Sequence, residues 1–228
     1  MGWPKLLVLV RHAESEGNVL SVEDRPKLDK GAQLYELTAR GHEQAKITGV
    51  YVQREFGPFD VRYTSYYTRA RQTMQYLVPA GTKWYEDPRL GEAQRGIWHA
   101  LTHAEIDQYY PVERIRKKRE GVYHYRPPGG ENWPDVELRI HSFLGTLARD
   151  CAEKSVLIVV HGHWHILFEK LIHHFSAEEA VKRYESRVED SSTGFNGHME
   201  NASVAVYRGD NGSLASGSSY DIPWKGKL

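Results

Sequence analysis

Cysteine is almost absent from this sequence, and neither sign of charge is in excess. Cys151 is the only cysteine among the 228 residues, which excludes an intramolecular disulfide and a cysteine-rich zinc site. Thirty Lys and Arg residues balance 30 Asp and Glu residues, whereas a general binder of nucleic acids or membrane surfaces would have a basic excess. We therefore expect neither nucleic acid nor a membrane as a partner, although the balance leaves room for a local basic pocket.

The sequence also lacks a long apolar run. No stretch approaches the ~20 apolar residues of a membrane span. The apolar run at residues 5–10 is short for a signal peptide and leads directly into Arg11. These absences favour a soluble protein of the cytoplasm, which fits the single cysteine.

Four segments have the pattern of β-strands. The runs at 5–10 (KLLVLV) and 155–160 (SVLIVV) are unbroken and rich in Val, Leu and Ile, which is typical of strands buried on both faces of a parallel sheet. Segments 60–65 and 202–209 are weaker candidates.

Helical patterns alternate with these strands. The predicted helices span 37–56, 65–77 and 132–153, and a last helix begins at Ser176. This alternation predicts a single α/β domain over residues 1–228, built as a three-layer α/β/α sandwich around a mostly parallel central sheet.

Two regions depart from the alternation. Residues 91–133 are rich in Trp, Tyr, His and Arg, and we expect them to form a helical or irregular lid, because long insertions in α/β domains often cover a substrate. The tail at 209–228 is rich in Gly, Ser and Asn, which predicts poor order unless it docks.

The insertion contains a basic run and a set of aromatic residues. We expect the basic run to be a solvated helix face and the aromatic residues to be the core of the insertion; capture of a polyanionic substrate and stacking on an aromatic group are the functional alternatives. These residues are Arg114, Arg116, Lys117, Lys118 and Arg119, and Trp98, Tyr109, Tyr110, Tyr123 and Tyr125.

Basic residues follow the predicted buried strands. Arg11 and His12 come after the first run, His161 comes after the second, and the helix after segment 60–65 carries Arg69. Ligands of open α/β sheets bind at the carboxyl ends of strands, so neighbouring strands would bring these side chains together. Arginine suits phosphate oxygens, and the N-termini of the following helices would add N–H donors. The pattern therefore predicts an anion site.

Six stretches, in this order, make the chain resemble the histidine phosphatase superfamily, the phosphoglycerate-mutase-like proteins. The first differs from the usual Arg-His-Gly by Ala13 in place of glycine. The stretches are LVRHAESEGN (9–18), LTARGHEQA (37–45), TSYYTRARQT (64–73), LGEAQRGIW (90–98), PPGGEN (127–132) and VLIVVHGH (156–163).

The resemblance implies catalytic roles. His12 would be the nucleophile that takes the phosphoryl group, Arg11, Arg69 and His161 would hold its oxygens, and Glu92 would be the general acid. Because phosphoryl transfer depends mostly on positioning and charge neutralisation, such a site needs neither metal nor cofactor. Further phosphate- or substrate-binding positions would be Asn18, Gln94, Gly162 and His163.

The chemistry adds expectations about protonation. The second ring nitrogen of His12 should donate to a backbone carbonyl, which fixes the tautomer. His161 would work best protonated, which among cations requires a compensating carboxylate such as Glu14. Activity should then be favoured at mildly acidic pH.

Phosphatase and mutase activities share this pocket. Phosphoglycerate mutases usually have Glu-Arg-His-Tyr-Gly at positions 92–96, His-Gly-Asn at 161–163 and an Asn-x-Phe-x-Gly-Trp stretch after Asn18, and this chain departs from all three. Residues 95–132 look more like those of broad-range acid phosphatases. We therefore expect a phosphatase acting on a small phosphorylated substrate, with a mutase and a non-catalytic phospho-ligand binder as alternatives. Edge-strand dimers occur among such proteins, so a homodimer is a candidate assembly.

Zinc is a further alternative, because His161, His163 and His165 alternate along the chain. Gly162, however, begins a turn, and Ile166 stands where a binuclear hydrolase would have an aspartate beside the third histidine. We therefore expect His163 and His165 to begin a helix or to line the rim of the site.

Overall fold

The two apolar runs lie side by side at the centre of a sheet. The computed structural model describes residues 2–186, 199–210, 213–216 and 220–228, and within them six strands follow the order β3-β2-β4-β1-β5-β6. β1 and β4 pair in parallel, with Arg11 opposite Val160. The strand bounds are β1 Leu6–Arg11, β2 Val61–Thr64, β3 Tyr85–Glu86, β4 Ser155–Val160, β5 Val204–Asp210 and β6 Ser213–Ser216.

The sheet is mostly parallel, as predicted. β3, β2, β4 and β1 run in parallel, and β5 and β6 add antiparallel strands at one edge. Every residue of β4 is buried, which explains its unbroken apolar run, because both faces of a central parallel strand are covered.

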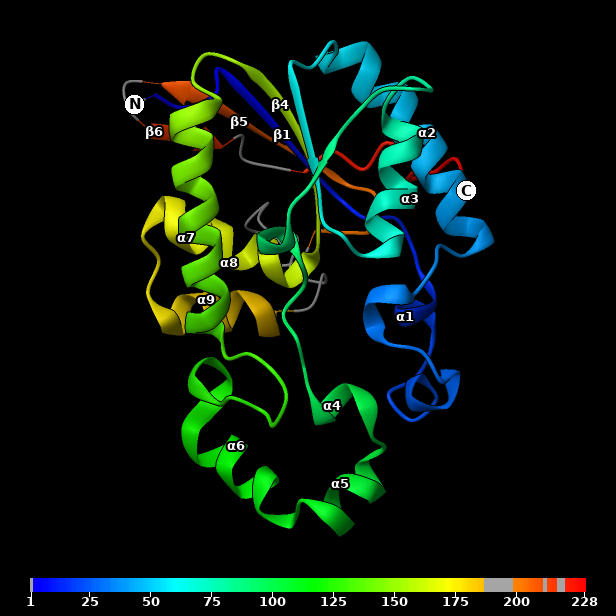
Figure 1. The fold of residues 1–228 in the computed structure, drawn as a ribbon, viewed down its shortest axis with the longest axis vertical. Helices are drawn as coiled ribbons and strands as arrows, with labels where there is room; N and C mark the ends of the chain where they lie inside the picture. Colours follow the sequence, from blue (N-terminus) through cyan, green and yellow to red (C-terminus); the bar gives the residue numbers. More distant parts are fainter. Residues whose placement is uncertain (1, 187–198, 211–212, 217–219) are drawn as a thin grey trace.

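Helices cover both faces of the sheet, which confirms the three-layer prediction (Figure 1). Alternate residues of β1 point to opposite layers: Leu7 and Leu9 join the core with α7 and α8, whereas Val8 and Val10 join the core with α2 and α3. The helix bounds of the two layers are α2 Ala39–Phe56, α3 Thr68–Leu77, α7 Trp133–Asp150, α8 Gly162–His173 and α9 Ala177–Glu185.

The expected lid is helical and extends beyond the end of the sandwich as a cap (Figure 1). It contains α4 (Ile97–Ala100), α5 (His103–Tyr109) and α6 (Pro111–His124). The short α1 (Glu16–Val19) and two 3₁₀ turns, Arg25–Leu28 and Ala32–Leu34, lie between β1 and α2. A further 3₁₀ turn, Pro88–Leu90, precedes the cap.

The aromatic residues of the cap fulfil the core prediction only in part. Tyr125 is buried, and Trp98 Nε1 donates to its hydroxyl at 2.9 Å. Tyr109 and Tyr110 are exposed by 62% and 38%, so for these two the prediction was wrong, because they lie where α5 passes into α6 at the protein surface.

The basic run lies on α6, and part of it is paired with carboxylates. Arg114 donates to Asp107, and Arg116 donates to Glu113 and Glu120. Most of its side chains are exposed, in keeping with the expected solvated face.

The described parts of the tail dock onto the sandwich. Asp221 pairs with Val204 as a β-bridge, and the buried indole of Trp224 donates to Asn201 O at 2.7 Å. None of the helices in the described residues is long and apolar enough to cross a membrane.

Candidate active site

The carboxyl ends of β1 and β4 bring His12 and His161 together. His12 N donates to Val160 O at 3.0 Å, so the first residue after β1 is tied to the end of β4. The ring centroids of His12 and His161 are 5.0 Å apart, and the two side chains are 3% and 0% exposed. The parallel pairing therefore produces the juxtaposition predicted from the strand ends.

Two contacts fix the tautomer of His12. Arg69 Nε donates to His12 Nε2 at 3.1 Å, and because arginine is only a donor, Nε2 carries the lone pair. The proton is therefore on Nδ1, which donates to Ala13 O at 2.8 Å. Burial first, and then the charges of Arg69 and Arg11, lower the pKa of His12 well below its ordinary value. His12 is thus a neutral imidazole with an available nucleophilic nitrogen, held by the backbone carbonyl that we expected.

Arg69 also determines the state of His161. Its Nη2 donates to His161 Nδ1 at 3.2 Å, so His161 Nε2 carries the proton and donates to Ser65 Oγ at 2.8 Å. Burial and the charge of Arg69 lower the pKa of His161 well below its ordinary value. Burial also lowers the pKa of Arg69 itself, to about 10. At neutral pH the Arg69 guanidinium is therefore charged, whereas His12 and His161 are neutral.

The expected compensation of a protonated His161 by Glu14 was wrong. The Glu14 carboxylate accepts the Thr38 hydroxyl at 2.7 Å and lies 3.8 Å from the Arg40 guanidinium. Glu14 therefore stabilises the start of α2, and His161 is neutral in the free protein.

Arg11 supplies the second arginine of the site. Its Nη1 donates to Met199 O, and its buried Nε has no hydrogen-bond partner among the described residues. Burial lowers its pKa, while Glu92 and Glu200 act in the opposite direction. The start of α8 lies close beside this cation, because a Cβ at Gly162 would be in van der Waals contact with the Arg11 guanidinium carbon at 3.4 Å.

Glu92 occupies the N-terminus of α8. Its carboxylate accepts Ala93 N at 3.0 Å, Trp164 N at 3.1 Å and His163 N at 3.3 Å. Burial raises the pKa of Glu92, but His163, the Ala93 N–H and Arg69 together outweigh this and lower it below its ordinary value. We expected backbone N–H groups at the N-terminus of α8 to donate to the ligand. For His163 N and Trp164 N this expectation was wrong, because both already donate to the Glu92 carboxylate.

The other resemblance motifs support the loop that carries His12. Ala13 N donates to Thr73 Oγ1 at 3.0 Å, and Thr73 Oγ1 donates to Arg69 O at 2.7 Å, which joins the loop to α3. A Cβ at Gly41 would lie 1.9 Å from Glu14 O, so only glycine lets α2 pack against the loop. The motifs thus fix the backbone around the nucleophile.

Asn18, Gln94, Gly162 and His163, the further positions predicted to bind phosphate or substrate, all line the cavity. Asn18 Oδ1 accepts from Ser15 N at 2.9 Å and from Asn201 Nδ2 at 3.3 Å, so its amide is held in place. Sequence reasoning missed Asn201, because nothing in the sequence connects the residues just before β5 with the loop after β1.

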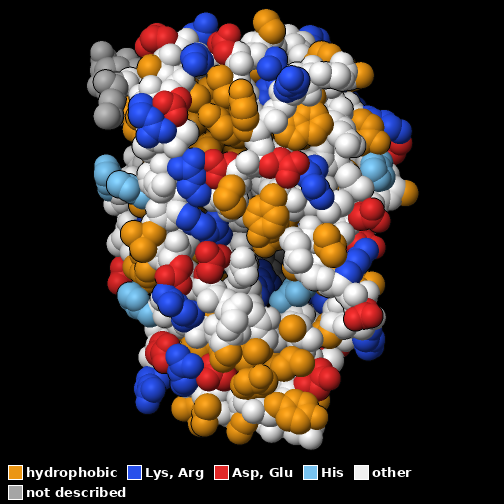
Figure 2. Space-filling model, viewed as in Figure 1, with side chains coloured by type: hydrophobic (Ala, Val, Ile, Leu, Met, Phe, Trp, Pro, Cys, Tyr) orange, Lys and Arg blue, Asp and Glu red, His pale blue; other side chains and the backbone are white. Residues whose placement is uncertain are grey.

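The cavity itself has a volume of about 550 Å³ and opens between the sandwich and the cap. Figure 2 shows the surface hollowed at this level, with a basic side chain visible inside. His12, Arg11, Arg69 and Glu92 line its sheet end. His161 lies behind them, fully buried.

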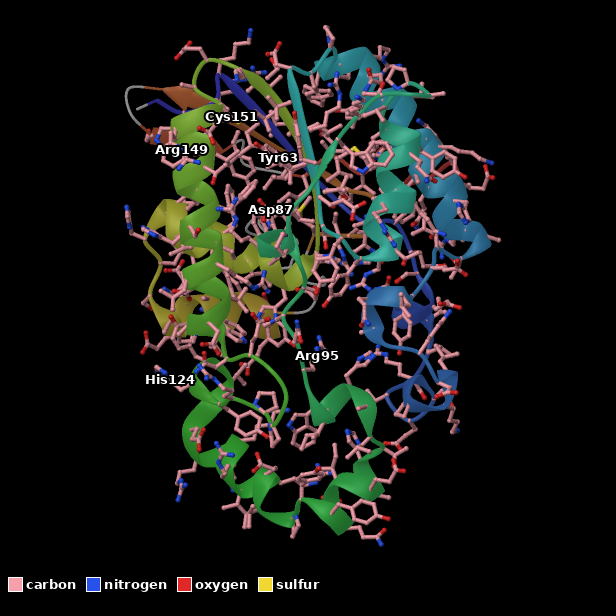
Figure 3. The ribbon with its side chains drawn as sticks, viewed as in Figure 1. Tyr63, Asp87, Arg95, His124, Arg149 and Cys151 are labelled. Carbon is pink, nitrogen blue, oxygen red and sulfur yellow. The ribbon has the colours of Figure 1, made fainter. Side chains whose placement is uncertain are left out.

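Among the lining residues that were missed as site residues are Tyr35, Arg25, Arg95 and His99. Arg95 lies in the motif LGEAQRGIW at a position where the mutases have tyrosine, which was a usable signal. Arg25 lies in a segment without periodicity or motif, so no signal in the sequence marks it. Figure 3 shows Arg95 on the connection between the sandwich and the cap, at the level of the opening.

The three alternating histidines do not form a zinc site. His161 contacts Arg69 and Ser65, the His163 ring packs on Trp133, and His165 Nε2 lies 2.6 Å from the Tyr207 hydroxyl. Across the described ranges, no group of three or more His, Cys, Asp or Glu residues is placed to hold a metal ion.

Two neutral histidines, two arginines and a carboxylate meet at one end of an α/β sheet, an arrangement whose chemistry suits a phosphoryl group. The chain belongs to the histidine phosphatase superfamily (branch 1), whose family model matches residues 7–184.

Its relatives include both mutases and phosphatases. A 2,3-bisphosphoglycerate-dependent phosphoglycerate mutase of Gloeobacter violaceus is 31% identical over 183 residues, which cover 78% of this chain and 80% of that protein. The mycobacterial glucosyl-3-phosphoglycerate phosphatase, solved with VO3, is 25% identical with a TM-score of 0.68, covering 93% of this chain and 97% of the other. The α-ribazole phosphatase of Shigella flexneri, at 19% identity, has the same fold, with a TM-score of 0.71 over 94% of this chain and 97% of the other.

Proposed function

We propose that this protein is a metal-independent phosphatase that hydrolyses small phosphomonoesters through a phosphohistidine on His12. One observation carries the proposal: a neutral, buried imidazole presents its unprotonated Nε2 between the guanidinium of Arg69 and the cavity. A nucleophile with a fixed tautomer beside preorganised cations is the arrangement that covalent phosphoryl transfer requires.

In the first step, His12 Nε2 attacks phosphorus and the bond to the ester oxygen breaks. Arg11 and Arg69 neutralise the charge on the equatorial oxygens. His161 Nε2–H, which donates to Ser65 Oγ in the free protein, would have to exchange this partner to donate to the same oxygens. The positive charge that develops on the imidazole is stabilised at Nδ1–H by the carbonyl of Ala13.

The leaving oxygen takes its proton from Glu92. This carboxyl is ionised in the free protein because its pKa is lowered. When a phosphate dianion binds, its charge offsets that of the cations around Glu92. This raises the pKa of the Glu92 carboxyl group and favours its protonated form. In the second step the Glu92 carboxylate takes a proton from water, the hydroxide attacks phosphorus, and the bond to His12 Nε2 breaks.

Arg69 must change partners during this cycle. In the free protein its Nε–H donates to the same nitrogen that attacks phosphorus. The incoming phosphate therefore has to draw the guanidinium away from His12 and onto its own oxygens. This exchange couples phosphate binding to exposure of the nucleophile.

A mutase is the second candidate, in which the phosphohistidine passes its group to a hydroxyl of a sugar acid rather than to water. The likeness that favours it is the 31% identity to a phosphoglycerate mutase over most of both chains. The departures at positions 92–96 and 161–163, where Gln94, Arg95 and His163 line the cavity, favour the phosphatase.

The test is hydrolysis of p-nitrophenyl phosphate between pH 4 and 8 in excess EDTA, with wild type and His12→Ala compared. We expect activity that resists EDTA and disappears in the variant. Activity abolished by EDTA would contradict a metal-independent reaction. Rapid interconversion of 2- and 3-phosphoglycerate without release of phosphate would establish the mutase instead.

A further inference from the structure

One buried aromatic side chain, that of Tyr67, lies against two of the groups that surround the nucleophile. Tyr67 immediately precedes α3 and lines the cavity, although only 4% of it is exposed. The guanidinium carbon of Arg69 lies over its ring, 4.6 Å from the centroid. The ring of His161 meets the same tyrosine at a steep angle, with the centroids 4.8 Å apart. Tyr67 therefore contacts both the buried cation and the histidine beside it.

The ring of Tyr67 is itself held in place from the side of Glu92. A Cβ at Gly91 would lie 3.5 Å from Tyr67 Cε1 and 3.1 Å from Tyr66 Cε1, so both rings pack on the backbone directly before Glu92. The rings of Tyr66 and Tyr67 meet edge-on, with the centroids 4.8 Å apart. A ring packed in this way has little freedom to move, so Tyr67 offers Arg69 a fixed surface.

The contact between Arg69 and Tyr67 depends on the ring and not on the hydroxyl. Burial raises the pKa of the Tyr67 hydroxyl above its ordinary value, so at neutral pH the group carries no negative charge that could pair with Arg69. What attracts the guanidinium is the face of the aromatic ring, and this attraction is stronger where water is excluded.

Arg69 needs such a surface because it has to exchange partners when phosphate binds. In the free protein its Nε–H donates to His12 and its Nη2 donates to His161. Attraction to an aromatic face depends little on where the N–H groups of the guanidinium point. Arg69 can therefore turn these groups from the histidines to phosphate oxygens while it stays over Tyr67.

We propose that Tyr67 is a positioning residue, whose ring holds the Arg69 guanidinium while Arg69 exchanges His12 and His161 for the oxygens of the phosphoryl group. This inference rests on the function proposed above and adds a residue to it. It applies to hydrolysis and to transfer between hydroxyls alike, because both begin with binding of a phosphoryl group. Without the ring, the phosphate would have to hold an otherwise loose guanidinium in place.

A double-mutant cycle separates the positioning of Arg69 from general packing. For Tyr67→Leu, which removes the ring, we expect kcat/KM on p-nitrophenyl phosphate to fall about tenfold, the cost of ordering and placing one long side chain. Tyr67→Phe, which keeps the ring, should lose no more than about twofold, and so should Tyr67→Leu when it is made in Arg69→Gln. Equal losses for Tyr67→Phe and Tyr67→Leu, or equal losses in the two backgrounds, would overturn the assignment.

Tyr63→Leu is the matched control for loss of a packed tyrosine. Tyr63 lies on β2, where its ring contacts those of Phe143 and Tyr85 at centroid distances of 5.3 and 5.7 Å, outside the lining of the cavity. We expect this variant to unfold at a lower urea concentration but to change kcat/KM by no more than about twofold. A loss as large as that of Tyr67→Leu would overturn the assignment, because any defect in packing would then have the same effect.

Binding of inorganic phosphate separates failure of this inference from failure of the proposed function. Calorimetry should show Kd for phosphate about tenfold higher in Tyr67→Leu than in wild type and Tyr67→Phe. This result without any hydrolysis would keep the role of Tyr67 and refute the phosphatase. Normal hydrolysis, with a Kd that Tyr67→Leu leaves unchanged, would overturn the role of Tyr67 alone.

A measurement on the wild type keeps the inference testable even if Tyr67→Leu folds poorly. The side-chain NMR signals of Arg69, assigned by comparison with Arg69→Gln, should have the upfield ring-current shift of protons that lie over an aromatic face. We expect this shift both without and with inorganic phosphate, whereas the Nε–H signal should move when phosphate replaces His12 as its acceptor. Loss of the ring-current shift on binding of phosphate would overturn the proposal.

Discussion

The two ends of the cavity hold their cations in different ways. At the sheet end, Arg69 is almost fully buried and donates to His12, His161 and the carbonyl of Ala32. At the cap end, Arg25 is half-buried and Arg95 is exposed, and neither has a carboxylate partner among the residues that the structure describes. The sheet end is therefore the more firmly held of the two, which suits the binding of a phosphoryl group that we propose for it. The cap end would then meet the part that distinguishes one substrate from another.

After loss of the nucleophile itself, removal of the Glu92 carboxyl group should lower the rate of turnover the most. We expect Glu92→Gln to lower kcat about 10²–10⁴-fold on an alkyl phosphate, because the poor leaving group needs a proton. The loss should be smaller on p-nitrophenyl phosphate, whose leaving group is stable as an anion. The measurement is the ratio of the two losses, and equal losses would contradict a general-acid role.

Removing the shared arginine should affect every substrate alike. We expect Arg69→Gln to lower kcat/KM about 10²–10³-fold, the cost of losing one preorganised donor to developing charge. The factor should be the same for phenyl phosphate and 4-carboxyphenyl phosphate, because both present the same phosphoryl group to Arg69. A loss confined to one of the two substrates would contradict a role for Arg69 at the phosphoryl group.

The hydroxyl that joins the nucleophile loop to α3 should be worth less. Thr73→Val removes a buried bridge between Ala13 N and Arg69 O, and we expect unfolding free energy to fall by about 1–3 kcal/mol. Urea denaturation measures this, with Thr82→Val as the control, since its side chain makes no hydrogen bond in the described structure. An equal, small change in both variants would remove the structural role given to Thr73.

The smallest effect is a displacement of the pH profile. His12 attacks only when neutral, and its pKa is lowered from 6.5 by burial and by Arg69 and Arg11. His12 is therefore protonated only at a lower pH than an ordinary histidine is. We expect the acidic limb of kcat/KM, corrected for ionisation of the substrate, to lie below pH 6.5. A limb centred at or above that value would show that free His12 is not held neutral.

The sheet end was predictable because its determinants are local. The ends of the two apolar runs mark the ends of β1 and β4, and the parallel pairing of these strands places His12 beside His161. What the sequence could not supply were the side-chain partners. Glu14 accepts a hydrogen bond from Thr38 because the loop packs on α2, and Glu92 accepts hydrogen bonds from the amides at the start of α8.

The cap end was not predictable from pattern. Arg25 lies in a segment with no periodicity, and its position beside Arg95 depends on how the segment folds toward the cap. Similarly, the contact of Asn201 with Asn18 joins residues 183 positions apart in the chain. Long-range contacts of this kind arise only from the tertiary fold.

The most direct test of the account is to trap the covalent intermediate. Wild-type protein is mixed with substrate, quenched in alkali within milliseconds, digested, and analysed by mass spectrometry for a phosphorylated peptide. We predict one phosphoryl group per active site, attached to His12, and none in His12→Ala. A phosphoryl group on another residue, or catalytic turnover without any phosphorylated protein, would contradict the central claim.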